Sequence, residues 1–129
     1  MMYWKDEYKI GVPDIDKQHM KLFEIAGRIY DLLKNDLYTD KYDKIIELVQ
    51  ELKDYTVYHF RFEEEYQQKI GYKKYFTHKV EHDDFIEKMN EINLDDIDRD
   101  HDQYLMEILE FVVKWIDEHI LQKDKLIVL

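Results

Sequence analysis

The stretch IIELVQELKDYTVYHFRFEEE, residues 45–65, decides the fold. Its apolar side chains recur three and four residues apart, the period of one helix face: Ile45, Leu48, Val49, Leu52 and Tyr55. The same face continues at this spacing to His59 and then to Glu63. Thr39 or Asp40 can cap the start of this segment, and Gly71 can end it. The stretch predicts an amphipathic helix whose buried face carries ionisable groups near its end.

Three further stretches show the same period. A first helix is predicted from an N-cap at Asp16 to about Asn35, and a third from about Lys74 to the polar stretch 93–98. The fourth carries its apolar side chains at Leu105, Ile108, Leu109, Val112 and Ile116. Four amphipathic helices with short connections predict an all-α fold, an up-down-up-down four-helix bundle.

The size and composition of the chain agree with a helical bundle. With 129 residues, the chain is expected to form a single domain, 1–129. Residues 1–15 are predicted to form an N-terminal extended arm and residues 16–124 the bundle itself. Three glycines and one proline offer few turns, which favours long helices over many short strands.

The charge and residue content exclude several classes of function. A net charge of −11 disfavours binding to nucleic acid, which requires basic patches. No apolar run approaches the ~20 residues that span a bilayer, so no membrane partner is expected, and a cytoplasmic location fits best. The absence of cysteine excludes disulfides, thiolate metal sites and a cysteine nucleophile.

Five of the six histidines interrupt the apolar faces of the predicted helices. Each is three or four residues from an apolar residue of its own helix, so each is expected on the buried side. With the glutamate of the second helix, the set comprises His19, His59, Glu63, His78, His82 and His119. The remaining histidine, His101, lies near the start of the fourth helix and is interpreted as a surface residue.

Helix direction places these six side chains at one end of the bundle. They lie at the start of the first helix, the end of the second, the start of the third and the end of the fourth. In an up-down-up-down bundle those four positions share one end. The six side chains are therefore expected to converge on one level of the core.

A metal explains this convergence better than structural histidines do. A single buried histidine is more often a core residue with a hydrogen-bonded partner than a ligand. Several unpaired buried polar groups, however, would each cost about 1–3 kcal/mol, which a bound metal offsets. Asp124, five residues after His119, lies about 140° around a regular helix. For Asp124 to join the site, the helix must become irregular near residues 121–123.

The number of ligand candidates favours two metals. Histidine and carboxylate ligands without sulfur suit iron, zinc, copper or manganese. Seven ligands exceed the four that one zinc ion usually takes. If two six-coordinate metals shared Glu63, Asp124 and one bridging oxygen, five histidines would leave about one position for a small molecule.

The chain resembles the hemerythrin family in its prokaryotic, bacteriohemerythrin branch. The resemblance covers nearly the whole sequence. It rests on the spacing of His19, His59-x-x-x-Glu63, His78-x-x-x-His82 and His119-x-x-x-x-Asp124. It also rests on the surrounding segments Gly11-Val12-Pro13-Asp14-Ile15-Asp16-Lys17-Gln18, His59-Phe60, Glu63-Glu64, Trp115-Ile116 and His119-Ile120.

The resemblance implies reversible binding of dioxygen at two non-haem irons with a bridging oxo or hydroxo group. It implies that His78, His82 and His119 bind one iron, that His19 and His59 bind the other, and that Glu63 and Asp124 bridge them. No enzymatic activity is expected, and dioxygen is the expected ligand. Ile116 and Trp115 are candidates for the apolar lining of the oxygen pocket.

The sequence departs from the family pattern at two positions. Gln67 stands where family members commonly carry methionine, one turn beyond Glu63 on the same face. Its amide could hydrogen-bond the carboxylate or admit water, which would affect the lifetime of bound oxygen. Lys73 replaces a frequent proline and is expected to affect only the connection between the second and third helices.

Other interpretations explain fewer of these residues. The segment His78-Lys79-Val80-Glu81-His82 fits the H-x-x-E-H signature of zinc peptidases, although a solvated Glu81 is the simpler interpretation. Ferritin-like di-iron oxidases use Glu-x-x-His motifs, which the chain lacks. An oxygen or redox sensor or an iron reservoir could use the same centre. A sensor is expected to act through a separate protein partner, as is oxygen delivery.

Overall fold

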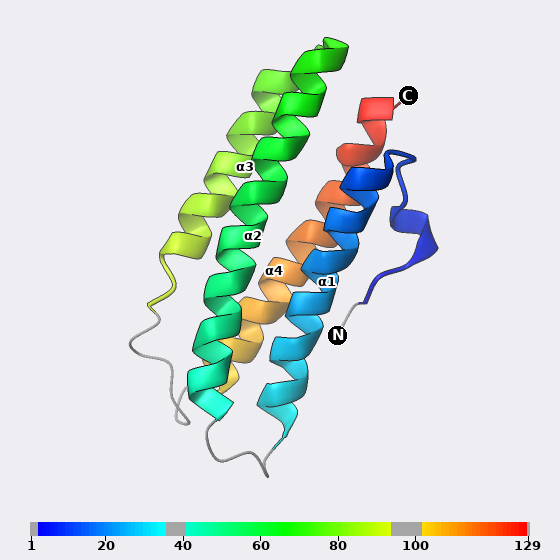
Figure 1. Ribbon diagram of the computed structural model, residues 1–129. Coiled ribbons are helices and arrows are strands. Elements are labelled where there is room, and N and C mark those ends of the chain that lie inside the picture. The colour runs from blue at the N-terminus through cyan, green and yellow to red at the C-terminus, as the bar shows by residue number, and fades with distance from the viewer. Residues whose placement is uncertain (1–2, 36–40, 94–101, 129) are drawn as a thin grey trace.

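The computed structural model describes residues 3–35, 41–93 and 102–128, which form an antiparallel four-helix bundle. The helices are α1 (Pro13–Lys34), α2 (Lys41–Ile70), α3 (Tyr75–Asn90) and α4 (Asp102–Gln122). Two short 3-10 helices, η1 (Asp6–Tyr8) and η4 (Asp124–Val128), lie at the two ends of the described chain. Neighbouring helices run in opposite directions, so the predicted up-down-up-down topology is confirmed (Figure 1).

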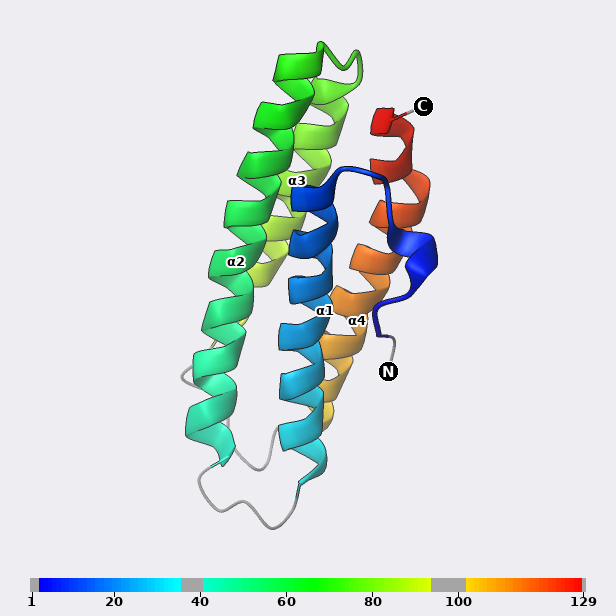
Figure 2. The same cartoon turned by 45° about the vertical axis from the view of Figure 1, so that its right-hand side comes forward.

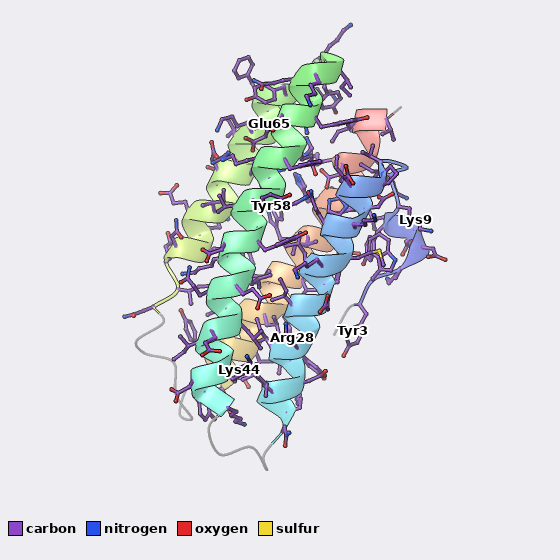
Figure 3. All side chains as sticks on the ribbon, in the orientation of Figure 1. Tyr3, Lys9, Arg28, Lys44, Tyr58 and Glu65 are labelled. Atoms are coloured by element: carbon purple, nitrogen blue, oxygen red, sulfur yellow. The ribbon has the colours of Figure 1, made fainter. Side chains whose placement is uncertain are left out.

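The binary pattern of the sequence accounts for the packing of the helices. The apolar faces of α1, α2 and α4 are buried against one another, and Phe85 and Met89 add the inner face of α3. Charged side chains such as Arg28, Lys44 and Glu65 project from the outside of the bundle (Figure 3). Among the described residues, no helix is both long enough and apolar enough to cross a lipid bilayer.

The start of α1 differs from its prediction. The helix begins at Pro13, and the backbone N–H of Asp16 already donates to the carbonyl of Val12 at 2.9 Å. Proline suits a first helical position because its φ is preset and its missing N–H is not required there. The predicted N-cap at Asp16 is therefore wrong.

The carboxylate of Asp16 instead fixes the N-terminal arm. It accepts hydrogen bonds from the backbone N–H groups of Ile10 at 2.8 Å and Gly11 at 3.2 Å. Gly11 has a φ of +94°, a left-handed conformation that favours glycine. The chain can thus turn sharply from the arm into α1.

The arm packs along the side of the bundle, next to α1 and α4 (Figure 2). Its backbone is extended on both sides of η1, in partial agreement with the prediction. The ring of Tyr8 is fully buried and stacks on Phe23 of α1, with centroids 4.8 Å apart. The Tyr8 hydroxyl donates to Asp117 of α4 at 2.5 Å, which ties the arm to two helices.

The turn between α2 and α3 follows the predicted stop at Gly71. This glycine has a φ of +67°, and its N–H donates to the carbonyl of Gln68 at 3.2 Å. The N–H of Tyr72 donates to the carbonyl of Gln67 at 2.9 Å, which completes a Schellman motif. The predicted cap at Thr39 or Asp40, most of the 93–98 break and His101 lie outside the described residues.

Candidate metal centre

Seven ionisable side chains meet in the interior at the end of the bundle where α2 turns into α3 (Figure 1). They come from all four helices and from the start of η4. None has more than 7% of its surface exposed: His19, His59, Glu63, His78, His82, His119 and Asp124. The structure therefore brings together every residue that the sequence nominated as a metal ligand.

These side chains form two overlapping groups. One group contains His78, His82 and His119, and the other contains His19 and His59. Glu63 and Asp124 belong to both groups, and within each group the candidate ligand atoms lie within 4.8 Å of one another.

Each shared carboxylate turns one oxygen towards each group of histidines. Oε2 of Glu63 lies 3.2 Å from Nε2 of His59, whereas Oε1 lies 3.3 Å from Nε2 of His78. Oδ2 of Asp124 lies 3.1 Å from Nε2 of His19, whereas Oδ1 lies 2.9 Å from Nε2 of His78. This orientation suits carboxylates that span two cations.

Several contacts in the cluster join atoms that cannot all be hydrogen-bonded to one another. Nε2 of His119 lies 2.6 Å from Nε2 of His78 and 3.1 Å from Nε2 of His82. Nε2 of His19, Oε2 of Glu63 and Oδ1 of Asp124 are buried without a hydrogen-bond partner among the described residues. Each such atom costs about 1–3 kcal/mol. A cation that accepts their lone pairs would remove this cost, so the donor set fits a metal.

The electrostatics keep both carboxylates ionised. Burial alone would raise the pKa of Glu63, but the nearby imidazoles of His19, His59 and His82 hold it well below its ordinary value. Burial is likewise overcome at Asp124, where His119, His19 and His78 hold the pKa far below its usual range. Anionic carboxylates are the form that metal ligation requires.

The histidines respond differently to the same environment. Burial lowers the pKa of His19 and of His82, but the nearby carboxylates outweigh it and raise each pKa to about 9. For His59 burial dominates, with repulsion from His19, so its pKa falls below the ordinary value. Protonated histidines can therefore balance the negative charge of the two carboxylates, and bound metal cations would provide that positive charge instead.

The backbone after α4 explains how Asp124 reaches the cluster. The α-helix ends at Gln122, and the N–H of Lys123 makes a last helical bond, 2.9 Å, to the carbonyl of His119. From Asp124 the chain continues as the tighter helix η4, which changes the rotation per residue. The predicted irregularity near residues 121–123 is confirmed.

Sequence reasoning missed the groups that face the Nδ1 atoms of the histidines. Gln18 Oε1 lies 2.8 Å from Nδ1 of His59, and Glu64 Oε2 lies 2.8 Å from Nδ1 of His82. Both side chains are buried although polar. Such partners fix the ring orientation and leave Nε2 free for a metal. The sequence offered one indication of these two residues, because Gln18 stands next to His19 and Glu64 stands next to Glu63.

Aromatic rings cover the histidines of the larger group. Phe60 stacks on His82 with centroids 3.9 Å apart, and Trp115 stacks on His119 with centroids 4.4 Å apart. Trp115 is half-buried, whereas Ile116 is buried on α4 one turn before His119. That Ile116 and Trp115 line an oxygen pocket stays a prediction.

Glu81 is not a fully solvated residue, as its simplest interpretation assumed. Its side chain is 30% exposed and lies between His119 and Lys123. Oε2 is 3.5 Å from Nδ1 of His119, and Oε1 is 3.5 Å from Nζ of Lys123. Glu81 therefore contacts the ligand candidate His119 from outside the cluster, and it does not belong to either group of candidate ligands.

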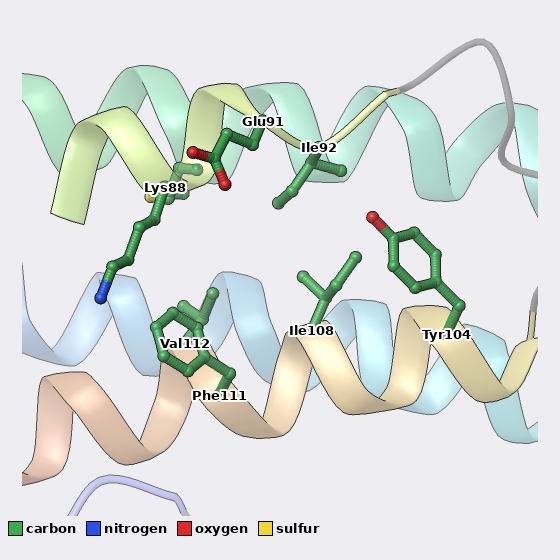
Figure 4. Close-up of a pocket in the computed structure, with 8 residues that line it drawn as sticks. Lys88, Glu91, Ile92, Tyr104, Ile108, Phe111 and Val112 are labelled. Carbon is green, nitrogen blue, oxygen red and sulfur yellow. The ribbon is translucent and has the colours of Figure 1, made fainter.

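A separate pocket lies at the other end of the bundle, between α3 and α4 (Figure 4). It encloses about 330 Å³, and most of its wall is apolar, including Ile92, Ile108 and Val112. Among its described lining residues there is no histidine, and Glu91 is the one carboxylate. It is therefore not part of the polar cluster.

Comparison with known proteins agrees with this geometry. The family model for the hemerythrin HHE cation binding domain matches residues 10–128. A bacteriohemerythrin from Clostridium acetobutylicum is 56% identical over 125 residues, covering 97% of each chain. One from Methylococcus capsulatus is 28% identical over 127 residues, covering 98% of this chain and 93% of that protein.

A bacteriohemerythrin from Pseudomonas aeruginosa is 32% identical over 90 residues, which is 70% of this chain and 56% of that protein. The match to the family model extends from the arm to η4 and includes all seven residues of the cluster. The chain therefore belongs to the hemerythrin family.

Proposed function

We propose that this chain binds dioxygen reversibly at a carboxylate-bridged pair of non-haem irons, as an oxygen carrier or store. The observation that supports this most directly is the double orientation of Glu63 and Asp124, with one oxygen of each carboxylate towards each histidine group. Two cations at these positions would satisfy Nε2 of His19, Oε2 of Glu63 and Oδ1 of Asp124, which are buried without a hydrogen-bond partner among the described residues.

The proposed ligand sets follow the two groups. His78, His82 and His119 would hold one iron, His19 and His59 the other, and Glu63 and Asp124 would lie between them, with an oxo or hydroxo group as the further bridge. The set with fewer histidines leaves room for a small ligand. When bound, such an iron pair supplies the two electrons that reversible dioxygen binding requires.

The rest of the site favours binding over the oxidation of a substrate. Imidazoles outnumber carboxylates by five to two in the cluster. The cluster is buried, with Glu63 and His82 fully covered, which excludes bulk water and protons. The low exposure of the cluster favours a small ligand over a larger substrate.

The test is to assay the metal in the purified protein, reduce it without air, and record visible spectra while oxygen is admitted and removed. About two irons per chain and a charge-transfer band that appears with oxygen and fades on its removal are expected. Irreversible oxidation, or zinc in place of iron, would contradict the carrier. Stable iron without an oxygen-dependent band would instead favour a reservoir.

A matched pair of variants connects the spectrum to the site. Glu63→Gln removes a buried carboxylate charge, whereas Glu65→Gln makes the same change on the exposed side of α2, two residues away. Glu63→Gln is expected to lose metal and the oxygen-dependent band, while Glu65→Gln keeps both. Equal iron content and spectra in the two variants would exclude Glu63 as a ligand.

A further inference from the structure

Gln67 is a buried polar residue that the ligand sets do not use. It lies on α2 one turn after Glu63, and its side chain is completely buried. Nε2 of its amide is 2.6 Å from Nδ1 of His78 and 3.5 Å from Oε1 of Glu63. Its Oε1 has no hydrogen-bond partner among the described residues. A fully buried amide with an unpaired oxygen beside a ligand candidate requires an explanation.

The contact with His78 is compatible with only one proton arrangement as the amide lies. Nε2 of Gln67 can only donate, so Nδ1 of His78 must accept and the proton of the neutral ring must sit on its Nε2. That proton can then be donated to Nε2 of His119, 2.6 Å away. A ring in this tautomer has no lone pair on Nε2 to offer to a metal.

Metal ligation through Nε2 of His78 reverses these roles. Nδ1 then carries the proton and needs an acceptor, and the acceptor nearest to it on Gln67 is Oε1. A half-turn of the amide exchanges its oxygen and nitrogen within nearly the same volume. The orientation of the amide depends mainly on its 2.6 Å contact with His78, because the 3.5 Å contact with Glu63 is at the outer limit of a hydrogen bond.

We propose that Gln67 is the positioning residue of His78, with its amide oxygen accepting the Nδ1–H hydrogen bond when His78 binds metal through Nε2. The inference rests on the proposed metal site and deepens it. The other Nδ1 atoms that have close partners support it, because His59 faces the oxygen of Gln18 and His82 faces that of Glu64, each at 2.8 Å. Gln67 completes the same arrangement at His78.

The amide is suited to both proton arrangements of His78, because its nitrogen can donate to Nδ1 and its oxygen can accept from Nδ1–H. Glutamate could accept from Nδ1–H but would bring a further negative charge next to Glu63, in addition to that of Asp124. Methionine has a similar length and is apolar, so it would fill the space and give His78 no strong acceptor. These two residues therefore separate the acceptor role of Gln67 from its packing role.

The experiment compares four anaerobic proteins loaded with Co²⁺: the natural sequence, Gln67→Met, Gln67→Glu and the control Gln68→Met. Gln68 is the next residue of α2 and is exposed, so the control makes the same chemical change outside the core. Bound cobalt is counted, and the release of cobalt to a chelator is timed. Proton NMR in H₂O and D₂O then identifies the exchangeable, cobalt-shifted Nδ1–H signals of the histidines.

The natural protein and Gln68→Met are expected to share one such signal that is shifted or lost in Gln67→Met and present in Gln67→Glu. Cobalt release from Gln67→Met is expected to be about 10-fold faster or more, in line with the loss of other outer partners of metal-bound histidine. A purely structural role would change unfolding without changing one histidine signal selectively.

Three results would overturn the inference. Unchanged histidine signals and release rates in Gln67→Met would show that the amide does not position His78. The same signal loss in Gln67→Glu as in Gln67→Met would show that the acceptor is irrelevant, and Gln67→Glu serves this purpose even if Gln67→Met does not fold. A natural protein that binds no cobalt at all would contradict the proposed metal site itself, which distinguishes that failure from the first two.

Discussion

Ile116 lies in the core of α4, one turn before His119, with 3% of its surface exposed. We expect Ile116→Ala to accelerate autoxidation of the oxygenated protein, because the lost side chain would open a path for water and protons to the centre. The variant should also lose about 2–5 kcal/mol of unfolding free energy, as large-to-small core substitutions do. The decay of the oxygen-dependent band measures the first effect and thermal unfolding the second.

Leu109→Ala is the matched control for that variant. Leu109 is equally buried on α4, two turns further from His119. It should lose comparable stability without faster decay of the band. Equal decay rates in the two alanine variants would remove Ile116 from the oxygen pocket.

The two glutamates that contact histidine Nδ1 atoms should differ in importance. Glu64 is buried and lies 2.8 Å from Nδ1 of His82, whereas Glu81 is partly exposed and lies 3.5 Å from Nδ1 of His119. We expect Glu64→Ala to weaken metal binding 10–100-fold, in line with other outer partners of metal-bound histidine. Glu81→Ala should retain both metals, with a smaller loss.

Competition with a chelator measures both affinities. Loss of the whole centre in Glu81→Ala, with Glu64→Ala unaffected, would reverse the proposed order. That outcome would favour the H-x-x-E-H interpretation of residues 78–82, in which Glu81 is the functional residue.

Among the helices and their ends, the arm and α4 are joined by the partly buried hydrogen bond from Tyr8 to Asp117. Burial first, and then the carboxylate of Asp117, raise the pKa of Tyr8 well above its ordinary value of 10.0. The phenol thus stays protonated in the folded protein at pH values where the unfolded chain loses the proton. The stability that depends on this group is complete below pH 10 and falls as the pH rises further.

Tyr8→Phe should remove this pH dependence. At neutral pH the variant is expected to lose about 1 kcal/mol, the usual contribution of one hydrogen bond. Above pH 10, unfolding free energies measured with urea should fall less steeply than those of the natural protein. The comparison isolates Tyr8 from the other tyrosines, which are the same in both chains. Parallel curves for the two proteins would show that the Tyr8 hydroxyl is not coupled to folding.

The end of a helix was predictable from the sequence where its backbone conformation favours one residue type. It was harder to predict where a side chain could either cap the helix or bind another segment. Gly71 ended α2 as expected, because its left-handed φ favours glycine. Asp16 has the chemistry of an N-cap, yet it binds the N–H groups of the arm instead. The choice depends on how the arm folds back, which helical periodicity does not encode.

For the whole molecule, the sequence predicted the convergence of six residues because alternating helix direction relates positions far apart in the chain, whereas Asp124 depended on an irregular end of the fourth helix. The same reasoning could not find the roles of Gln18 or Glu64, since their neighbours depend on the rotation of each helix about its own axis. It also left Glu81 as a solvated residue, although His119 and Lys123 lie on either side of it.

Removal of the metal should destabilise the entire bundle, because the cluster joins all four helices. A ligand present at 100 times its dissociation constant adds about 2.7 kcal/mol to the free energy of unfolding. For a chain of this size that corresponds to roughly 10 °C in Tm. Calorimetry before and after chelation measures the shift, and re-addition of iron should restore it. An unchanged Tm would mean that the polar cluster is stable without a cation.

The turn at Gly71 divides the centre as well as the chain. The segment before it holds His19, His59 and Glu63, and the segment after it holds His78, His82, His119 and Asp124. Each half thus contains the histidines of one group and one of the two shared carboxylates. If the chain were cleaved at this turn, each piece would carry part of the cluster, and with the proposed metal site the reassembly of the fragments would become a metal-dependent association.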